Sequence, residues 1–304
     1  MREQISKLSV FAALLAFGTV TAAPLPAQQT LPAAKSSGMT IYESFEGSSG
    51  SGTNVFDLNS AVGYDFNRHW GADLGVPIYF VTPPSTLKGF ASQSNGIGNV
   101  YMDVRFRFDN PIVDYHSTIG LTAPTGSTTK GFSTGHVTYN WDNNFSRSIG
   151  RFAPFVDLEV GDSLNSTSSP QRRIIHRPFI TFGNEAQFQA GSDMDVFGPL
   201  SVTADVYKVL PWGPQTIYSR ILKKGVNTGK KAKNHRVYEV VSTTKGGAAL
   251  VQDDGIDFAA DVALRHSIQI EAGYDYSMHY AAGTLFFSVG FEMTGLFHRG
   301  SGKF

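Results

Sequence analysis

The sequence predicts an all-β protein, a transmembrane antiparallel up-and-down β-barrel of about 12 strands. Three observations predict this fold class: strand-length segments that alternate apolar and polar residues, connections that alternate between short and long, and an N-terminal export signal. The 304 residues include no cysteine, so an exported chain of this size must be stabilised without disulfides. A closed sheet supplies that stability through a large, regular network of backbone hydrogen bonds.

The clearest alternation lies in the segment 97–109. One parity holds Val100, Met102, Val104, Phe106 and Phe108, and the other holds Tyr101, Asp103, Arg105 and Arg107. Segments of about ten to fourteen residues repeat this pattern, which is typical of strands with one polar and one apolar face. We expect strands at 40–47, 53–66, 70–82, 97–109, 115–125, 136–146, 151–163, 177–191, 196–211, 256–265, 268–279 and 284–293.

A soluble β-sandwich would also alternate, but its strands average only about five or six residues. A strand tilted by about 45° needs roughly nine to eleven residues to cross a bilayer, which these segments supply. The aromatic residues near the predicted strand ends suit interfacial girdles. They are Tyr42, Tyr64, Phe66, Trp70, Phe80, Tyr139, Trp141, Phe145, Phe152, Trp212, Tyr274 and Tyr276. Segment length therefore favours the membrane barrel.

The connections between these segments follow a second regularity, because short and long ones alternate. The short connections are 67–69, 110–114, 147–150, 192–195 and a tight turn near 265–267, and the long ones are 83–96, 126–135, 164–176 and 212–255. Outer-membrane barrels have short periplasmic turns and long extracellular loops. The loop 212–255 is too long for a plain connector. We expect either a hairpin of Thr216–Leu222 with Arg236–Val241 above the membrane, or a segment folded inward as a constriction.

The N-terminus has the pattern of a cleaved signal peptide. Arg2 and Lys7 supply positive charge, and Leu8–Ala16 is an apolar run too short to span a bilayer as a helix. Cleavage is expected after Ala27, with Ala22 as the alternative.

Three parts of the chain follow from this pattern. Residues 1–27 are the signal peptide, 28–39 a flexible N-terminal segment, and 40–304 the barrel, so the expected location is the outer membrane. The absence of cysteine also excludes a lipoprotein, which needs a cysteine to carry the lipid.

If the apolar parity faces lipid, the opposite parity faces the lumen, because charge on the lipid face costs several kcal/mol near the midplane. The expected pore-lining residues are Asp57, Asp73, Tyr79, Tyr101, Asp103, Arg105, Arg107, Asp142, Asp157, Glu159, Glu185, Asp205, Asp261, Glu271 and Glu292. Further inward charges are Asp65, Asp257, Asp275, Arg151 and Arg265. Acids far outnumber bases, which favours cations or neutral solutes over anions. Alternatively, Arg105 and Arg107 tie neighbouring acids into ladders that fill a narrow barrel.

The predicted outer loops carry the opposite charge. Their bases are Lys88, Lys130, Arg172, Arg173, Arg177, Arg220, Lys223, Lys224, Lys230, Lys231, Lys233, Arg236 and Lys245. These residues are placed to contact outer-membrane lipids, including the phosphates of lipopolysaccharide, or they form an ordinary solvated loop surface. The whole chain has 25 basic and 25 acidic residues, so no net charge favours nucleic acid.

Four sequence stretches resemble a known family. The stretches are NGIGNVYMDVRFRF at 95–108, DLNSAVGYDFNRHWGADLGVPIYFV at 57–81, GRFAPFVDLEVG at 150–161 and TAPTGSTTKGFSTG at 122–135. They resemble outer-membrane transporter-like proteins of the phenol-degradation-pathway type. The shared features are a G-x-G-[DN] strand start after a strand that ends in an apolar, proline-containing stretch. The resemblance implies a barrel for passive uptake of small molecules, aromatic ones among them, and leaves the substrate open.

A membrane-embedded lipid hydrolase is the enzymatic alternative. Outer-membrane phospholipase A and the lipid A deacylase use a His-x-Ser-Asn arrangement in which the histidine activates the serine. Here Ser94 and Asn95 match, but Ser92 occupies the position of the base. A histidine from another strand, such as His116 or His136, would have to replace it, so we do not expect an enzyme.

No cofactor or metal site is expected. The eight histidines are scattered singly, without His-x-His or His-Glu-x-x-His spacing.

The C-terminal Phe304 fits the aromatic signal read by the barrel-assembly machinery if the last strand runs to the end of the chain. If the last strand ends earlier, Phe291 and Phe297 are the expected recognition residues for this machinery. The sequence thus predicts an outer-membrane channel or transporter for small solutes, and the runner-up is a plugged structural or adhesive barrel.

Overall fold

The computed structural model describes residues 38–50, 53–82, 94–127, 132–133, 135–162, 179–219, 242–246, 252–264 and 268–292. The long strands are β1 (Gly38–Gly50), β2 (Thr53–Asp65), β3 (Trp70–Thr82), β5 (Val100–Asp109), β6 (Asp114–Ala123), β7 (Thr138–Ser146), β8 (Phe152–Gly161), β10 (Glu185–Phe197), β11 (Leu200–Pro211), β14 (Asp253–Leu264), β15 (Ile268–Ser277) and β16 (Ala282–Glu292). The short strands are β4 (Ser94–Ile97), β9 (Phe179–Phe182), β12 (Gln215–Ser219) and β13 (Ser242–Gly246).

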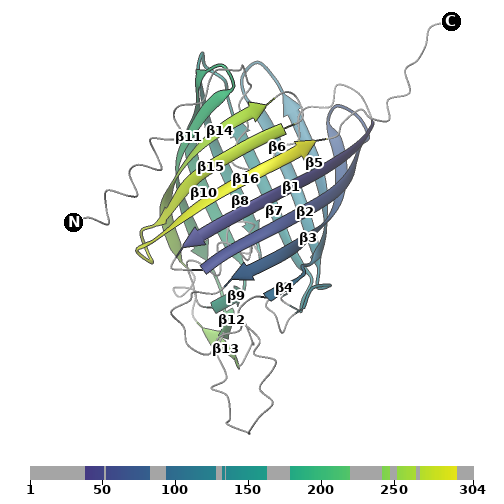
Figure 1. Cartoon of the computed structure of the whole chain (residues 1–304), viewed down its shortest axis with the longest axis vertical. Helices are drawn as coiled ribbons and strands as arrows, with labels where there is room; N and C mark the ends of the chain where they lie inside the picture. Colours follow the sequence, from purple (N-terminus) through teal and green to yellow (C-terminus); the bar gives the residue numbers. More distant parts are fainter. Residues whose placement is uncertain are drawn as a thin grey trace, which may run out of the picture.

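The twelve long strands form one closed barrel in which sequential long strands are antiparallel neighbours (Figure 1). The ring closes where β1 pairs with β16, with Tyr42 opposite Glu292 at one end of the seam and Ser49 opposite Leu285 at the other. Every long strand therefore has a partner on both sides, which leaves no sheet edge exposed. The prediction of an all-β, 12-stranded, up-and-down barrel is confirmed.

The two ends of the barrel differ. At the short-turn end, β1 begins, β16 ends, and the turns between β2 and β3, β5 and β6, β7 and β8, and β10 and β11 are short. At the long-loop end, drawn at the bottom of Figure 1, β4, β9, β12 and β13 extend the wall. In the orientation that the sequence predicts, the short-turn end faces the periplasm and the long-loop end faces the cell exterior.

The hairpin predicted within loop 212–255 is wrong in its pairing. Thr216 lies opposite Lys245 and Ser219 opposite Ser242, so β12 pairs with β13 and not with 236–241, which lies outside the described residues. β12 also pairs with β9. This small sheet continues the wall because β9 leads into β10, β12 follows β11, and β13 precedes β14. The pairing follows from the register of the barrel strands from which β9, β12 and β13 extend. The alternation of residues within one segment indicates its two faces but does not indicate which segment it pairs with.

Predicted boundaries also differ from the structure, among them the turn between β10 and β11 and the start of β1. The turn expected at 192–195 lies inside β10, and the chain reverses at Gly198, whose φ of 54° suits glycine. Asp193 faces inward, where Thr203 Oγ1 donates to its Oδ1 at 2.6 Å. Asp193 and Asp195 are therefore lumen-facing strand residues and not turn residues. β1 begins at Gly38, two residues before the predicted barrel boundary.

The barrel is inside out compared with a soluble protein. Outward apolar side chains remain exposed, as in Leu74 (57%) and Val206 (53%), while inward acids are covered, as in Glu159 (2%) and Asp275 (1%). A wall that is apolar outside and charged inside is suited to lipid and not to water. In the parts of the chain that the structure describes, no helix is long and apolar enough to cross a membrane.

Aromatic residues form a band on the outer wall near the short-turn end. Trp70 and Phe106 have ring centroids 4.8 Å apart, and Tyr115 and Phe145 are stacked at 4.9 Å. Phe106 and Tyr115, 6.0 Å apart, join the two pairs across β5 and β6. This band fits the predicted interfacial girdle. Tyr42 was wrongly included in it, because this residue turns inward beside Gly290.

The outward parity of β5 gives a direct test. Val104 lies opposite Ala72 and Ile119 on the lipid-facing side, whereas Asp103 faces the lumen opposite Asp73. We expect Val104→Arg to destabilise the inserted barrel by about 2–4 kcal/mol, and Asp103→Arg to cost far less. Refolding yield in lipid vesicles, read from heat-modifiable gel migration, measures both. Equal tolerance of the two substitutions would contradict the assignment of the faces.

Candidate functional site

The candidate site is the inner face of the barrel, and the alternation of the strands turns all fifteen expected pore-lining residues toward it. Buried ones are Asp57, Asp73, Asp142, Asp157, Glu159, Glu185, Asp205 and Asp261. Half-buried ones are Tyr79, Tyr101, Asp103, Arg105, Arg107, Glu271 and Glu292. Thirteen Asp and Glu residues are buried among the described residues, and no Lys or Arg is. The inner wall is therefore strongly acidic.

The sequence analysis missed Glu46, Asp193, Asp195 and Asp253 as inward acids. Asp193 was assigned to a turn, and Asp253 precedes the predicted start of its strand. Glu46 escaped notice because β1 carries one glutamate on each face. Glu43 points outward and accepts a hydrogen bond from Ser60 at 2.6 Å, whereas Glu46 points inward opposite Asp57. The alternation along β1 is the signal that identifies Glu46 as an inward residue.

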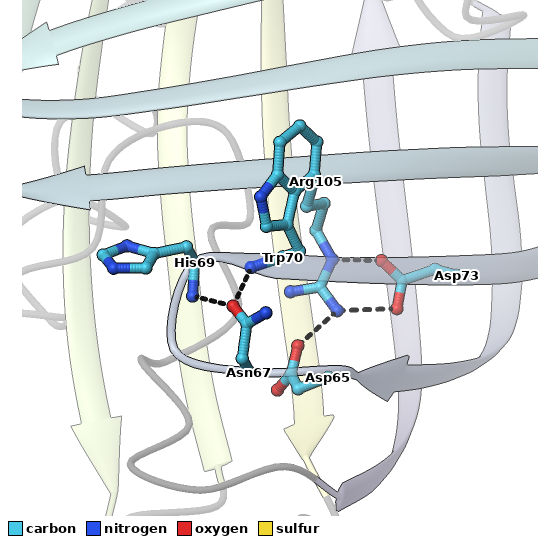
Figure 2. Close-up of polar contacts among 6 residues, drawn as sticks. All are labelled: Asp65, Asn67, His69, Trp70, Asp73 and Arg105. Carbon is cyan, nitrogen blue, oxygen red and sulfur yellow. Dashed lines mark hydrogen bonds and ion pairs between the residues drawn. The ribbon is translucent and has the colours of Figure 1, made fainter.

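Arg105 is held by two acids on the neighbouring strands (Figure 2). Its Nη2 donates to Asp73 Oδ1 at 3.0 Å and to Asp65 Oδ1 at 3.1 Å, and its Nε also bonds Asp73. Gly71 lies beneath the guanidinium, where a Cβ would meet Arg105 Nη2 at 2.9 Å. The glycine thus lets one arginine reach both β2 and β3. This cluster corresponds to the predicted ladder, but its contacts run across strands and not along β5.

The turn between β2 and β3 positions the two acids of this cluster. The Oδ1 of Asn67 accepts hydrogen bonds from the backbone N–H of His69 at 2.8 Å and of Trp70 at 3.0 Å. Figure 2 shows this Asn67 turn beside the Arg105 contacts. A side chain that satisfies two turn amides fixes the turn. The register that it sets places Asp65 and Asp73 on either side of Gly71.

Acids elsewhere on the inner face lie opposite other acids. The cross-strand pairs are Glu46 with Asp57, Asp73 with Asp103, Asp142 with Glu159, Asp205 with Asp257, Asp257 with Asp275, and Asp261 with Glu271. Directly opposite residues have Cβ atoms about 4.5–5.5 Å apart, and like charges at that distance are destabilising. Hydrogen bonds such as Tyr207 OH to Asp275 Oδ1, at 3.2 Å, reduce the cost but add no positive charge.

The inward aromatic side chains lie along the wall. A Cβ on Gly75 would meet the Tyr101 ring at 2.3 Å, and one on Gly273 would meet the Phe286 ring at 2.3 Å. The Tyr101 hydroxyl donates to Asn59 Oδ1 at 3.1 Å, which holds this ring against the wall. Glycines on neighbouring strands thus provide the space in which these rings rest.

Several residues singled out by the sequence analysis are not part of the inner face that the structure describes. Arg151 is wrong as a lumen residue, because it is exposed in the turn between β7 and β8. Arg265, Phe297 and Phe304 lie outside the described residues, and so do the side chains of the basic loop residues. Phe291, the other proposed assembly signal, points outward near the end of β16 and is 41% exposed.

The serine of the hydrolase alternative is not placed beside His116. Ser94 lies on β4 opposite Val81 at the long-loop end, whereas His116 lies near the start of β6 at the short-turn end. His116 Nε2 is 3.5 Å from Asp109 Oδ1. His136 is exposed in the connection between β6 and β7. Among the residues described, no group of three or more His, Cys, Asp or Glu could hold a metal ion.

A closed barrel with an apolar exterior and an acidic interior is an outer-membrane β-barrel of the porin-like type. An outer-membrane channel from Pseudomonas putida F1 matches with a TM-score of 0.52 at 10% identity, over 89% of this chain and 100% of that one. The NanC porin (TM-score 0.45, 9% identity, 84% and 100%) and the KdgM porin (0.44, 8%, 83% and 98%) also match.

At 10% identity, the match to the Pseudomonas putida F1 channel shows a shared fold alone. No protein-family model and no curated protein matches the sequence. The likeness supports the predicted barrel class, while the phenol-degradation type stays a prediction. The function must therefore be argued from the inner wall.

The Arg105 cluster yields a stability prediction. Removing the guanidinium in Arg105→Met leaves the carboxylates of Asp65 and Asp73 without their shared donor, so we expect a loss of about 1–3 kcal/mol of unfolding free energy. The side chains are largely covered, at 16% and 9% exposure, so solvent does not replace the contact fully. Urea unfolding in lipid vesicles measures the loss. Arg151→Met in the exposed turn should change stability by less than about 0.5 kcal/mol, and an equal effect would contradict the cluster's role.

Proposed function

We propose that the protein is an outer-membrane channel for the passive passage of small cationic or neutral solutes, without catalytic chemistry. The observation that carries the proposal is the set of inward acids that lie opposite one another, such as Asp257 between Asp205 and Asp275. The inward bases of the described strands are Arg105 and Arg107, both on β5, and Arg105 is already held by Asp65 and Asp73. Among the side chains that the structure describes, the long strands from β7 to β15 carry acids and no Arg or Lys on the inward parity.

An acidic wall of this kind attracts cations. Two carboxylates about 4 Å apart repel by about 1 kcal/mol even in water, and by more where water is partly excluded. The repulsion falls when a cation or a proton lies between them, so the wall gathers positive charge from solution. Clefts lined by one sign of charge raise the local concentration of the opposite ion. Rings of acidic side chains select cations by this means in other channels.

The orientation of two inward rings favours an open lumen over the plugged alternative, because barrel size alone does not decide between them. Barrels of about 8 strands are filled by their own side chains, whereas those of about 16–18 strands leave an aqueous channel. With 12 strands, the orientation of inward side chains decides the outcome. Tyr101 and Phe286 lie against glycines of the wall and not across the lumen. Their faces also offer an apolar surface to solutes that carry an aromatic group.

The proposed partners follow from the two surfaces. We propose that the exposed apolar belt, with Leu74 and Val206, contacts outer-membrane lipids. We propose that the basic loop residues named above bind lipopolysaccharide phosphates, and that the barrel-assembly machinery inserts a chain delivered by its cleaved signal peptide.

Planar-bilayer recording tests the channel directly. Purified protein in a salt gradient should give reproducible current steps, with a reversal potential that favours cations. A correctly folded barrel that stays silent would contradict the channel and support a plugged structural barrel. Anion-favouring steps would contradict the role of the acidic wall.

Asp257 gives a sharper prediction. Asp257→Asn removes the repulsion with both Asp205 and Asp275, so it should lower the cation-to-anion permeability ratio and raise unfolding stability by up to about 1 kcal/mol. Asp254→Asn, three residues earlier on β14 and on the opposite face of that strand, is the matched control and should leave selectivity unchanged. Reversal potentials and urea midpoints report the two effects. A selectivity equal to that of the unchanged chain would show that solutes do not pass Asp257.

A further inference from the structure

Part of the connection between β6 and β7 lies inside the barrel. Phe132 is 4% exposed and its neighbour Ser133 is also buried, although both belong to a loop at the end where loops usually face water. Phe132 packs against Val55 of β2 and Val81 of β3, both of which face inward and are fully covered. The ring therefore sits on the inner wall at the long-loop end.

An aromatic contact fixes the position of this side chain. The rings of Phe132 and Tyr79 are stacked with centroids 5.5 Å apart and an interplanar angle of 24°. Tyr79 in turn lies over Gly98, where a Cβ would meet its ring at 2.4 Å. Offset aromatic pairs of this kind are worth about 0.5–1.5 kcal/mol beyond the area that they bury. Phe132 thus has a defined place on the wall.

The base of the loop is held at the interruption between β4 and β5. Thr125 Oγ1 accepts a hydrogen bond from Val100 N at 2.8 Å, and Asn99 Oδ1 accepts one from Gly126 N at 3.1 Å. Gly126 approaches Gly98 so closely that a Cβ on Gly126 would meet Gly98 C at 2.9 Å. The break in the ladder at Gly98 and Asn99 therefore receives the loop and directs it inward.

The acids at the same end lie on the other side of the ring. Glu159 is near the end of β8, Glu185 starts β10, and Asp253 starts β14, and all three are buried. In the order of the barrel, β3 and β11 are six strands apart in either direction, as are β2 and β10. The β2–β3 side of the mouth thus carries Val55, Val81 and Phe132, with Asp57 one inward position deeper on β2, and the β8–β14 side carries the three acids beside Val209 of β11.

We propose that Phe132 is a specificity-determining residue that narrows this mouth from the β2–β3 side and confines solutes to the acidic β8–β14 side. The inference rests on the proposed channel function and adds to it the residue that sets both size limit and charge selection. The covered Phe132 ring holds the inward-turned segment at Phe132 and Ser133 against the wall, so this segment limits the width available to solutes while Glu159 and Glu185 select their charge. A wider mouth would let solutes pass farther from the acids.

Phe132→Ala tests the proposal in the whole chain. We expect single-channel conductance to rise on the order of twofold, together with a lower cation-to-anion permeability ratio and passage of larger uncharged solutes in vesicle swelling. Phe258→Ala is the matched control, because Phe258 is 52% exposed on the lipid-facing side of β14. Heat-modifiable migration confirms that both variants fold.

A second variant uses the absence of cysteine from the chain. Phe132→Cys supplies a single thiol, and its reaction with a bulky neutral thiol reagent during recording should reduce the current that the substitution has raised. The same reagent should leave the current of Phe258→Cys unchanged. This within-channel comparison does not depend on how well each variant refolds.

The outcomes separate this inference from the proposed function. A cation-favouring wild type whose conductance and selectivity are unchanged in Phe132→Ala overturns the role of Phe132 and leaves the channel intact. A silent wild type with a conducting Phe132→Ala supports the role of Phe132 and contradicts an open channel. Silence of every folded variant overturns both.

Discussion

Closure of the sheet is the constraint on which the rest of this structure depends. Lipid offers no hydrogen-bond partner to a backbone N–H or C=O, so a strand can cross a membrane only if both its edges are paired. The pairing of β1 with β16 completes that condition. Once the ring is closed, each residue of a strand faces either lipid or lumen, and a slip of one residue in register would exchange the two faces. The sharp division between apolar exterior and acidic interior is therefore a consequence of closure.

The acidic interior has a cost that closure makes unavoidable. Neighbouring strands are held in fixed register, so Asp205, Asp257 and Asp275 must lie beside one another wherever the sequence places them. A protein selected for stability alone would alternate acids with bases, as Arg105 does between Asp65 and Asp73. Retaining rows of like charge is understandable if the lumen works on cations, which are drawn from solution toward an acidic wall.

Strand periodicity predicted the fold, because a period of two reports which residues share a face and requires no knowledge of tertiary contacts. The same parity argument identified most inward acids and missed Glu46, Asp193, Asp195 and Asp253. Its errors arose where local chemistry was ambiguous. Gly-Ser-Asp at 191–193 has turn composition but lies inside β10, and Tyr42 has girdle composition but turns inward. Whether a polar or aromatic residue faces the lumen or forms a turn is decided by the neighbouring strands.

Phe132 could not have been assigned from sequence, because its position depends on a contact between distant segments. The stretch NGIGN at 95–99 first resembles an ordinary strand start, and Thr125 an ordinary loop residue. The structure joins them where the ladder is interrupted, with Gly98 making room on one side for Tyr79 and on the other for Gly126. A side chain larger than glycine at either position would require the loop or the ring to move. In most sheets, the interruption of one strand would be a local irregularity. Here the interruption between β4 and β5 receives the loop that carries Phe132, so the β2–β3 side of the mouth differs from the β8–β14 side.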